Sequence, residues 1–432
     1  MQVDSGKPQL SLSSKYPTNF EGIGNGKQWL NSKSADDETE GLWRVHDKLY
    51  DVTSFIQSHP GGPSWLELTK GTDITEAFEV HHLSSTPEQI LKKYYVRKAQ
   101  TPRNSPFTFK DDGFYRTLKR NVQGVLRDIP KDSGKFTDVT IDLMLVGTFF
   151  FAIFASAFGS LISGIVSAFL LTFTTIAAHN YFHRRDNFRM YYFNLSLMDF
   201  REWRISHSLS HHLFPNTIYD MEVTNLASYT PYLPIKKSTF FKCTSPVIAI
   251  IFWVSLYLLT YVKRMLAMVK TREAHLSDLV PFTLPLAMLL LSGVTPMAVL
   301  KMWLFIVTMA SFIFGAIAFN AAHHHPDIFH EGDAPRSAQV DWAIHQLDAV
   351  ADRHEITHNA FLVLTNFGDH ALHHLFPTLD HSTLNYLYPI FKKTLKEFNL
   401  EHNVKSQIDM VFGQFQQLKR ETPNTVPPGR GV

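Results

Sequence analysis

The sequence predicts a small α+β domain followed by a larger all-α domain that spans a membrane. Three observations lead to this fold class. Residues 20–100 combine short β-type runs with Gly and Pro punctuation, which is typical of a small mixed domain. Uncharged runs long enough to cross a bilayer follow residue 142. Twenty-two histidines gather in tight clusters beside those runs, more than ordinary usage explains.

Composition narrows the classes of function. A formal net charge of +2, with 19% charged residues, gives no global field that would recruit nucleic acid, so no nucleic-acid partner is expected. Cys243 is the only cysteine, which excludes an intrachain disulfide and a thiolate metal cluster. The first ~30 residues lack the apolar core of a secretory signal, so the N-terminus is expected to stay cytosolic. Any metal must therefore use other ligands, of which histidine is the most abundant.

The chain divides at changes of composition. In the small domain the runs LWRVH and LYDVT predict strands, and the polar stretch TPRNSP at 101–106 marks its end. The predicted parts are a polar tail over 1–19, the small domain over 20–100, a linker and amphipathic region over 101–142, the membrane domain over 143–395, and a cytosolic C-terminal tail over 396–432.

Four membrane-spanning helices are expected. The stretch 143–178 carries no charge and turns at Gly159 and Ser160, which predicts spans over 143–159 and 161–178. Lys301 separates two further runs, which predicts spans over 280–300 and 302–322. The run 245–262 has Lys and Arg on both flanks, so we interpret it as interfacial. An even number of crossings then leaves the histidine clusters before and after these runs on one side.

The small domain carries a haem-binding pattern. The stretch VHDKLYDVTSFIQSHPGG, followed by GTDITEAFEVHH, resembles cytochrome b5 across the whole small domain and implies haem b. Two neutral imidazoles occupy both axial positions of such a haem iron, which makes the centre an electron carrier. His59 fits the first ligand, beside the tight turn that Gly61 and Gly62 allow. The family pattern selects His82 as the second ligand, with His81 as the fallback.

Three histidine clusters accompany the membrane domain. They are HNYFH, RISHSLSHHLFPN and GDHALHHLFPT, which supply His179 and His183, then His207, His211 and His212, then His370, His373 and His374. Residues i, i+3 and i+4 share one helix face, as ligands to one metal need. Eight imidazoles exceed what one metal can hold, so two metals are expected. A redox-inert metal would have no use for electrons from a fused haem, which selects two iron ions over zinc.

These clusters resemble the histidine boxes of the membrane fatty acid desaturase and hydroxylase superfamily over 179–389. The b5-fused acyl desaturases, including the group called cytochrome b5-related proteins, are most similar. The resemblance implies four transmembrane helices, boxes on the cytosolic side and a di-iron centre that activates O2, with no catalytic residue beyond the metal ligands. It also implies a ninth ligand four residues after an Asn. Asn320 and His324 fit this spacing, with His323 and His325 as competitors.

Two departures from the family concern the boxes. The second box has three residues between His207 and the following pair, where most b5-fused desaturases have two. The third box begins with His370, where front-end desaturases carry Gln. Both changes leave the position of oxidation open.

Other polar residues near the boxes have weaker signals. Six carboxylates could orient ligand imidazoles by accepting their second N–H; they are Asp186, Asp220, Asp348, Asp352, Glu355 and Asp369. Arg184 and Arg185 follow the first box, where they could meet a phosphate or set the membrane topology. The pair His354 and His358 could supply an outer ligand or orient one, but a cytosolic helix that covers the site is the favoured interpretation.

The function expected from these observations is O2-dependent desaturation of a lipid acyl chain. The resemblance implies a multi-pass protein of the endoplasmic reticulum membrane, with both termini and the boxes in the cytosol. NADH-cytochrome b5 reductase is the expected electron donor to the fused domain. The substrate could be an acyl-CoA, a phospholipid acyl chain or a sphingoid base. Two alternatives remain: a lipid hydroxylase with the same centre, and a non-catalytic membrane haem protein that transfers electrons.

Overall fold

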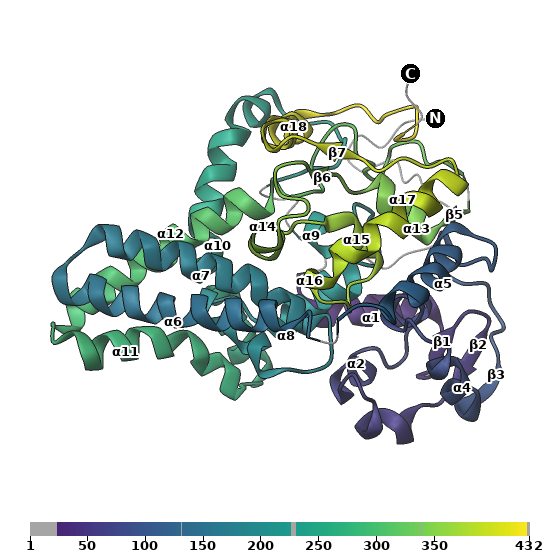
Figure 1. The fold of residues 1–432 in the computed structure, drawn as a ribbon, viewed down its shortest axis with the longest axis horizontal. Coiled ribbons are helices and arrows are strands. Elements are labelled where there is room, and N and C mark those ends of the chain that lie inside the picture. The colour runs from purple at the N-terminus through teal and green to yellow at the C-terminus, as the bar shows by residue number, and fades with distance from the viewer. Residues whose placement is uncertain (1–23, 131, 226–229, 338, 430–432) are drawn as a thin grey trace.

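The computed structural model describes residues 24–130, 132–225, 230–337 and 339–429. An α+β N-terminal module (residues 24–100) precedes a helical domain, which confirms the predicted fold class. Figure 1 shows long helices extending to one side and a cap of short helices and loops between them and the module. The predicted polar tail over 1–19 lies outside the described residues.

The N-terminal module is a three-stranded sheet with short helices. Its elements are α1 (Gly26–Asp37), β1 (Trp43–Val45), β2 (Lys48–Tyr50), η1 (Thr53–Ser58), α2 (Pro63–Leu68), α3 (Thr75–His81), α4 (Thr86–Leu91), η2 (Lys92–Tyr94) and β3 (Tyr95–Lys98). The strands are antiparallel in the order β1-β2-β3, and the first two lie in the predicted runs. A small core around Trp43 and Val45 packs against the helices.

The linker is folded onto the cap. Strand β4 (Phe107–Thr108) pairs in parallel with β5 (Val340–Asp341), a segment more than two hundred residues later. Helix α5 (Phe114–Leu126) is amphipathic, as predicted, and buries Phe114, Tyr115, Leu118 and Val122. The module is therefore attached to the cap by packed structure as well as by chain continuity.

The first membrane hairpin has its turn where the sequence places it. Helix α6 (Lys135–Phe158) ends at Gly159, whose φ of +61° is accessible to glycine without strain. Helix α7 (Leu161–Phe182) begins after Ser160, whose hydroxyl accepts the Ser163 amide as an N-cap. Both helices extend beyond the predicted spans. In the N-terminal part of α6, the Asp142 carboxylate forms an ion pair with Arg189. This charge is therefore neutralised just before the apolar run begins.

The second hairpin turns earlier than predicted. The 3-10 helix η5 (Leu276–Phe282) leads into α11 (Thr283–Ser292), and α12 (Pro296–Ala318) follows. Gly293, at φ +73°, ends α11, and the Thr295 hydroxyl caps α12 with Pro296 at its first position. The predicted boundary at Lys301, between spans over 280–300 and 302–322, is wrong. Lys301 lies inside α12 and is exposed near the helix end, where a lysine can extend toward water.

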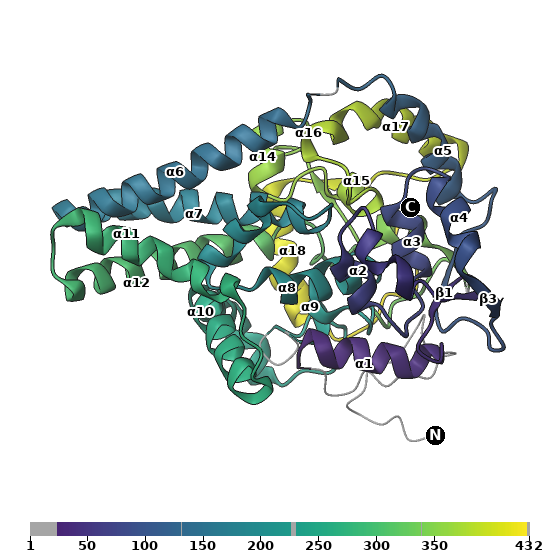
Figure 2. The same cartoon turned by 90° about the horizontal axis from the view of Figure 1, so that it is seen from below.

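The run 245–262 belongs to a long helix, α10 (Thr239–Thr271). Among the described residues, four helices are long and apolar enough to cross a membrane by length and composition: α6, α7, α10 and α12. The segment of η5 and α11 is shorter. In Figures 1 and 2, α6, α7, α11 and α12 lie side by side, and α10 runs across the base of this bundle. An interfacial position for the run 245–262 stays a prediction.

The cap is built from many short elements between and after the long helices. They are η3 (Phe188–Ser196), α8 (Phe200–Trp203), the π-helix η4 (Arg204–His211), α9 (Met221–Thr224), α13 (Trp342–Asp348), β6 (Asp352–Arg353), α14 (Ala360–Thr365), α15 (His370–Leu375), α16 (His381–Leu384), η6 (Asn385–Leu387), α17 (Tyr388–Glu397), β7 (Val404–Lys405) and α18 (Gln407–Lys419). Strand β6 pairs in parallel with β7. Helix α18 packs on α10, and Gln417 donates to the Tyr232 carbonyl. The predicted C-terminal tail is thus folded through α18.

Candidate functional site

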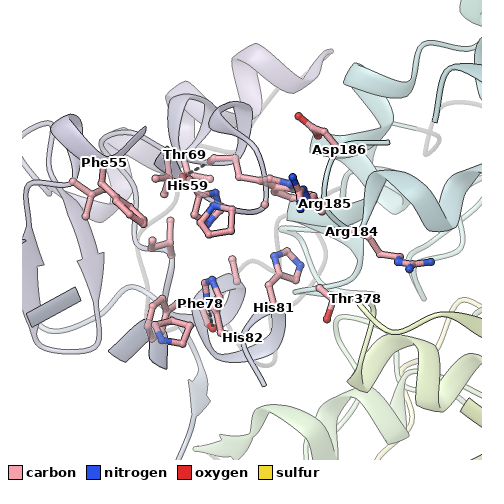
Figure 3. A pocket seen from close by; sticks show the side chains of 18 of the residues that line it. Phe55, His59, Thr69, Phe78, His81, His82, Arg184, Arg185, Asp186 and Thr378 are labelled. Atoms are coloured by element: carbon pink, nitrogen blue, oxygen red, sulfur yellow. Dashed lines mark hydrogen bonds between the residues drawn. The ribbon is translucent and has the colours of Figure 1, made fainter. Parts of the chain in front are cut away.

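A cavity of about 1050 Å³ lies between the N-terminal module and the segment that follows α7. Phe55 and Phe78 line its module side, whereas Arg184, Arg185 and Asp186 line the opposite side. Figure 3 shows these two groups on opposite sides of the cavity, with the rings of the predicted haem ligands between them.

His59 and His82 face each other across this cavity. Their ring centroids are 6.3 Å apart. Each Nδ1 lies 2.9 Å from a backbone carbonyl, of Gly62 for His59 and of Phe78 for His82. Nδ1 then carries the proton and each Nε2 keeps its lone pair for a metal. Because metal–imidazole bonds are about 2 Å long, one ion fits between the rings. The pair therefore fits the two residues that would hold a haem iron.

The neighbouring residues support this geometry. A Cβ added at Gly61 would lie 3.0 Å from the His59 ring, so glycine permits the close turn. Burial lowers the pKa of His82 to about 4, so its imidazole is neutral near pH 7, as a ligand must be. His81, the fallback ligand, packs with its ring centroid 5.1 Å from that of Trp65. The structure thus brings His82, rather than His81, opposite His59.

Histidines from four distant segments converge beside the inner end of the bundle. Two groups each bring one nitrogen per residue within 4.8 Å of one another: His179, His183, His207 and His373, and His211, His323, His370 and His374. All these rings are buried. Without a bound cation, eight buried imidazole rings facing one another would leave many polar nitrogens unsatisfied. The arrangement fits two adjacent metal ions.

Close nitrogen contacts define the two groups. The Nε2 atoms of His179 and His373 are 3.1 Å apart, and those of His323 and His370 are 2.8 Å apart. His211 Nε2 also lies 3.1 Å from His323 Nε2. The atoms in these contacts are all Nε2, and the Nδ1 atoms of His179 and His323 bond to backbone carbonyls.

His212 lies between the two groups. Its Nε2 is 3.1 Å from His207 Nε2 in the first group, and its ring stacks on His374 of the second at a centroid distance of 4.0 Å. Seven of the eight predicted box ligands therefore belong directly to one group or the other, and the eighth contacts both.

The extra residue in the second box is absorbed by the π-helix η4. The His212 amide donates to the His207 carbonyl at 2.8 Å, an i to i+5 bond that replaces the usual i to i+4 bond. Such turns are rare and occur often at functional sites. The wider turn puts His207 and His212 on one face, so a spacing of three residues still directs both rings into the cluster. The departure from the family pattern is thereby accommodated.

Side-chain oxygens around the cluster accept hydrogen bonds from several of the rings. His211 Nδ1 lies 2.8 Å from an Asp220 oxygen, and His207 Nδ1 lies 2.6 Å from a Glu222 oxygen. The Gln346 side-chain oxygen is 2.9 Å from His374 Nδ1. Acceptors at Nδ1 fix the tautomer that presents Nε2 to a metal. Asp220 was among the carboxylates suggested by the sequence; Glu222 and Gln346 were not, because nothing in their local pattern distinguishes them.

The other suggested carboxylates have different partners. Asp352 accepts from the backbone amide of His370 and also contacts His402 Nε2. The remaining four pair away from the rings: Asp186 with Arg204, Asp348 with Arg336, Glu355 with the Gln407 amide and Asp369 with the Tyr388 hydroxyl. His354 and His358 are exposed on a turn, not on the predicted covering helix.

The carboxylates set the charge of one imidazole. Burial alone would lower the pKa of His211, but Glu222 and Asp220 outweigh it and raise that pKa to about 9. Burial lowers the pKa of His370 to about 3, and it lowers the pKa of His374 well below its usual range. In the metal-free protein at pH 7, therefore, His211 is protonated, whereas these two rings are neutral and ready to bind a cation.

The structure corrects the predicted ninth ligand. His323, not His324, enters the second group, and its Nδ1 lies 2.9 Å from the Ala349 carbonyl. The His324 ring instead stacks on Tyr232, with centroids 3.5 Å apart and planes 3° apart. His325 contacts Asp327 and Asp409 near the surface. The three consecutive side chains point in different directions after α12, so spacing from Asn320 could not select among them.

His381 was not singled out by the sequence. Its ring is buried, with its centroid 4.5 Å from that of His373, and neither ring nitrogen has a hydrogen-bond partner among the residues described. It lies outside the three boxes, and only the fold brings it beside the first group.

Comparison with known proteins agrees with this geometry. A family model described as fatty acid desaturase matches residues 87–406. The chain belongs to this family. A second model, described as cytochrome b5-like haem/steroid binding domain, matches residues 27–100. The resemblance inferred from the boxes and from the haem pattern is confirmed for this b5-fused desaturase-family chain.

Individual relatives match most of the length of the chain. A cytochrome b5-related protein of Drosophila melanogaster is 42% identical over 429 residues, which cover 97% of this chain and 98% of that protein. A probable Delta(5) fatty acid desaturase C of Dictyostelium discoideum is 25% identical over 435 residues, covering 89% of this chain and 94% of that protein. No solved structure matches the chain. The desaturase family, the fused module and the histidine groups fit a membrane-bound oxidoreductase of the di-iron type.

Proposed function

We propose that this protein is a membrane-bound, O2-dependent lipid desaturase that takes electrons from its own haem module. The observation that carries the proposal is the pair of four-histidine groups, buried at the inner end of an apolar bundle. One group includes His183, which also lines the cavity that contains His59 and His82. A redox cofactor in the module would therefore border the metal centre directly.

The proposed ligands follow from the geometry. His59 and His82 would hold haem b. Two iron ions would be held by His179, His183, His207, His211, His212, His323, His370, His373 and His374. When bound, such irons supply O2 activation and removal of hydrogen from an unactivated C–H bond. His324 is not included, because its ring stacks on Tyr232 outside both groups.

The protein's own residues position and insulate this chemistry. Asp220, Glu222 and Gln346 hold ligand rings in one tautomer. The buried surroundings exclude water from the metal groups, which protects reactive oxidants from side reactions. The inner ends of α7 and α12, which carry His179 and lead into His323, connect the centre with the apolar bundle. A lipid chain approaching from the membrane would present a methylene there.

The setting proposed for this activity is the endoplasmic reticulum membrane. The histidine groups, the module and both termini would face the cytosol, where NADH-cytochrome b5 reductase would reduce the haem. The substrate would be a fatty acyl chain, carried by CoA or a phospholipid, or a sphingoid base.

Expression in a desaturase-deficient yeast, with mass-spectrometric lipid profiling, tests the proposal. Wild type should form new unsaturated lipids, and both His59→Ala and His373→Ala should abolish them. New hydroxylated lipids instead would identify a hydroxylase. A wild-type protein that contains haem but no non-haem iron, and that leaves the profile unchanged on feeding each substrate class, would favour the non-catalytic electron-transfer alternative.

A further inference from the structure

The cavity that contains His59 and His82 has two unlike ends. The end inside the module is apolar and is lined by Val52, Phe55, Leu66, Phe78 and Leu91, among others. The other end is closed by the desaturase domain, through polar residues that include Arg184, Arg185, Asp186, Asn187 and Thr378. Figure 3 shows labelled members of each group on their own side of the two imidazoles.

Haem has a matching asymmetry. One edge of the porphyrin is apolar, and the opposite edge carries two carboxylates. The apolar edge is stabilised by burial against Phe55 and Phe78, whereas carboxylates need water or a cation. A haem held by His59 and His82 is therefore expected to direct its carboxylates toward the desaturase domain.

Most charges at that end are already paired. Arg184 bonds to Asp380 at 2.7 Å. Asp186 bonds to Arg204 at 2.8 Å, and Asp138 lies 3.3 Å from Arg189. Neither acidic residue of the lining is thus left uncompensated.

Arg185 differs from its neighbours in this respect. Within the described part of the chain, it makes no hydrogen bond or ion pair, although it lines the cavity. It is a cation without an anion, at the end of the cavity where an anionic edge is expected.

Contacts on either side of Arg185 fix its segment against the module. The Asp186 amide donates to the Gly61 carbonyl at 3.3 Å, next to the ligand His59. Gly62 has a φ of +110°, a conformation that side chains rarely adopt, and a Cβ there would contact the Asp186 carboxylate, so glycine favours this close approach. Arg204 donates to the Ser64 hydroxyl at 2.7 Å and lies over the Trp65 ring, 4.7 Å from its centroid. Arg185 is therefore held beside the turn that carries the first haem ligand.

We propose that Arg185, a residue of the desaturase domain, completes the haem site of the module by pairing with a haem carboxylate. This inference rests on the proposed haem binding and extends it. The haem would then be a bridge between the two domains, with its carboxylate edge anchored two residues from His183. The sequence suggested a phosphate as the partner of Arg185. In this proposal, the partner is a carboxylate of the haem instead.

The pairing of Arg185 with a haem carboxylate is tested in the full-length protein by changing the residue and the cofactor separately and together. Wild type and Arg185→Gln are each reconstituted with haem and with haem dimethyl ester, whose carboxylates are blocked. The rate of haem transfer to excess apomyoglobin is measured by absorbance. With haem, Arg185→Gln should release it about 2- to 5-fold faster, the range for a partly exposed ion pair. With the dimethyl ester, the two proteins should release it equally fast.

Controls and a second readout make the test decisive. Arg127→Gln changes another exposed arginine, which does not line the cavity, and should behave as wild type. Arg185→Lys should restore most of the wild-type retention of haem. The haem midpoint potential should fall in Arg185→Gln, because a nearby positive charge favours the reduced, less positive iron.

Several results would overturn the inference. One is an equal release rate and potential in Arg185→Gln and Arg127→Gln. A second is faster release from Arg185→Gln that persists with the dimethyl ester. A third is unchanged haem binding together with weaker binding to anionic phospholipid vesicles, which would assign Arg185 to a lipid phosphate. If wild type bound no haem at all, the proposed function itself would fail, and that outcome is separate.

Discussion

The haem pocket and the histidine groups use the same side chain in opposite ways. In the pocket, each imidazole is fixed by a carbonyl three or four residues away, Gly62 for His59 and Phe78 for His82. In the metal groups, rings from four segments are fixed mostly by acceptors farther along the chain, such as Ala349 for His323, although His179 uses the carbonyl of Ile176, three residues away. The first site depends on local backbone, whereas the second depends mostly on the assembled cap. A change in the cap should therefore affect the metals and leave the haem intact.

The largest effect should come from removing one metal or haem ligand. His373→Ala should reduce lipid oxidation to background and lower non-haem iron, because its Nε2 meets His179 within the first group. The haem absorbance should not change. His82→Ala should do the reverse, with loss of haem but retention of non-haem iron. Loss of both cofactors in either variant would contradict the independence of the two sites.

A smaller effect distinguishes two adjacent histidines. His323→Ala should lose much of one iron equivalent, because it removes a ring from the second group. His324→Phe keeps a flat ring against Tyr232 and should retain both irons. Iron per protein, measured by inductively coupled plasma mass spectrometry, checks the pair. Loss of iron in His324→Phe with retention in His323→Ala would restore the assignment from sequence spacing.

A change beyond the ligands should have a graded effect. Asp220→Asn weakens the acceptor at His211 Nδ1 and should lower metal affinity or activity by about 10- to 100-fold. Glu355→Gln is the matched control, because Glu355 is exposed and, in the described part of the chain, accepts from the Gln407 amide rather than from a ligand imidazole. Titration of iron into the chelator-treated protein measures both. Equal iron affinities of Asp220→Asn and Glu355→Gln would show that the Asp220 carboxylate does not orient the His211 ring.

The smallest effect concerns Glu79, which connects helix α3 of the module with helix α5 of the linker. Burial raises the pKa of Glu79 in α3, but hydrogen bonds from His46 and Arg116 and the charge of Lys119 overcome it and lower that pKa from 4.5 to about 2. This carboxylate therefore stabilises the fold above pH 4.5, and the stabilisation is lost as pH falls through about 2. Glu79→Gln should reduce stability at pH 7 by about 1.5 to 3 kcal/mol.

Denaturant unfolding of the module, followed by haem absorbance from pH 7 to pH 2, measures this contribution. The variant should lose less stability than wild type as the pH falls below 4.5. Arg127→Gln, whose side chain has no ion pair in the described structure, serves as the control. Parallel pH curves for Glu79→Gln and wild type would contradict the assigned role of the carboxylate.

The same contrast explains what the sequence could predict. The facing rings of His59 and His82 and the turn at Gly159 depend on neighbouring residues, so local patterns could indicate them. The turn at Gly293 was missed because Lys301 interrupts the apolar run, yet a lysine near a helix end can reach water. Placing His323 in the second group required the path of the chain after α12. Glu222 and His381 became visible only when distant segments met.

The boxes show this limit most clearly. Their spacing predicted eight converging imidazoles, and the fold brings all eight together. The second box looked irregular because it has three residues between His207 and the following pair, where most b5-fused desaturases have two. The i to i+5 bond from His212 to His207 removes that irregularity.

Counting the iron of the purified full-length protein tests the central claim most directly. The measurement combines total iron with haem content, for wild type and for His373→Ala. The account predicts one haem and about two non-haem irons per wild-type chain, with unchanged haem and reduced non-haem iron in the variant. One haem without non-haem iron in a protein purified after iron-replete expression would contradict it.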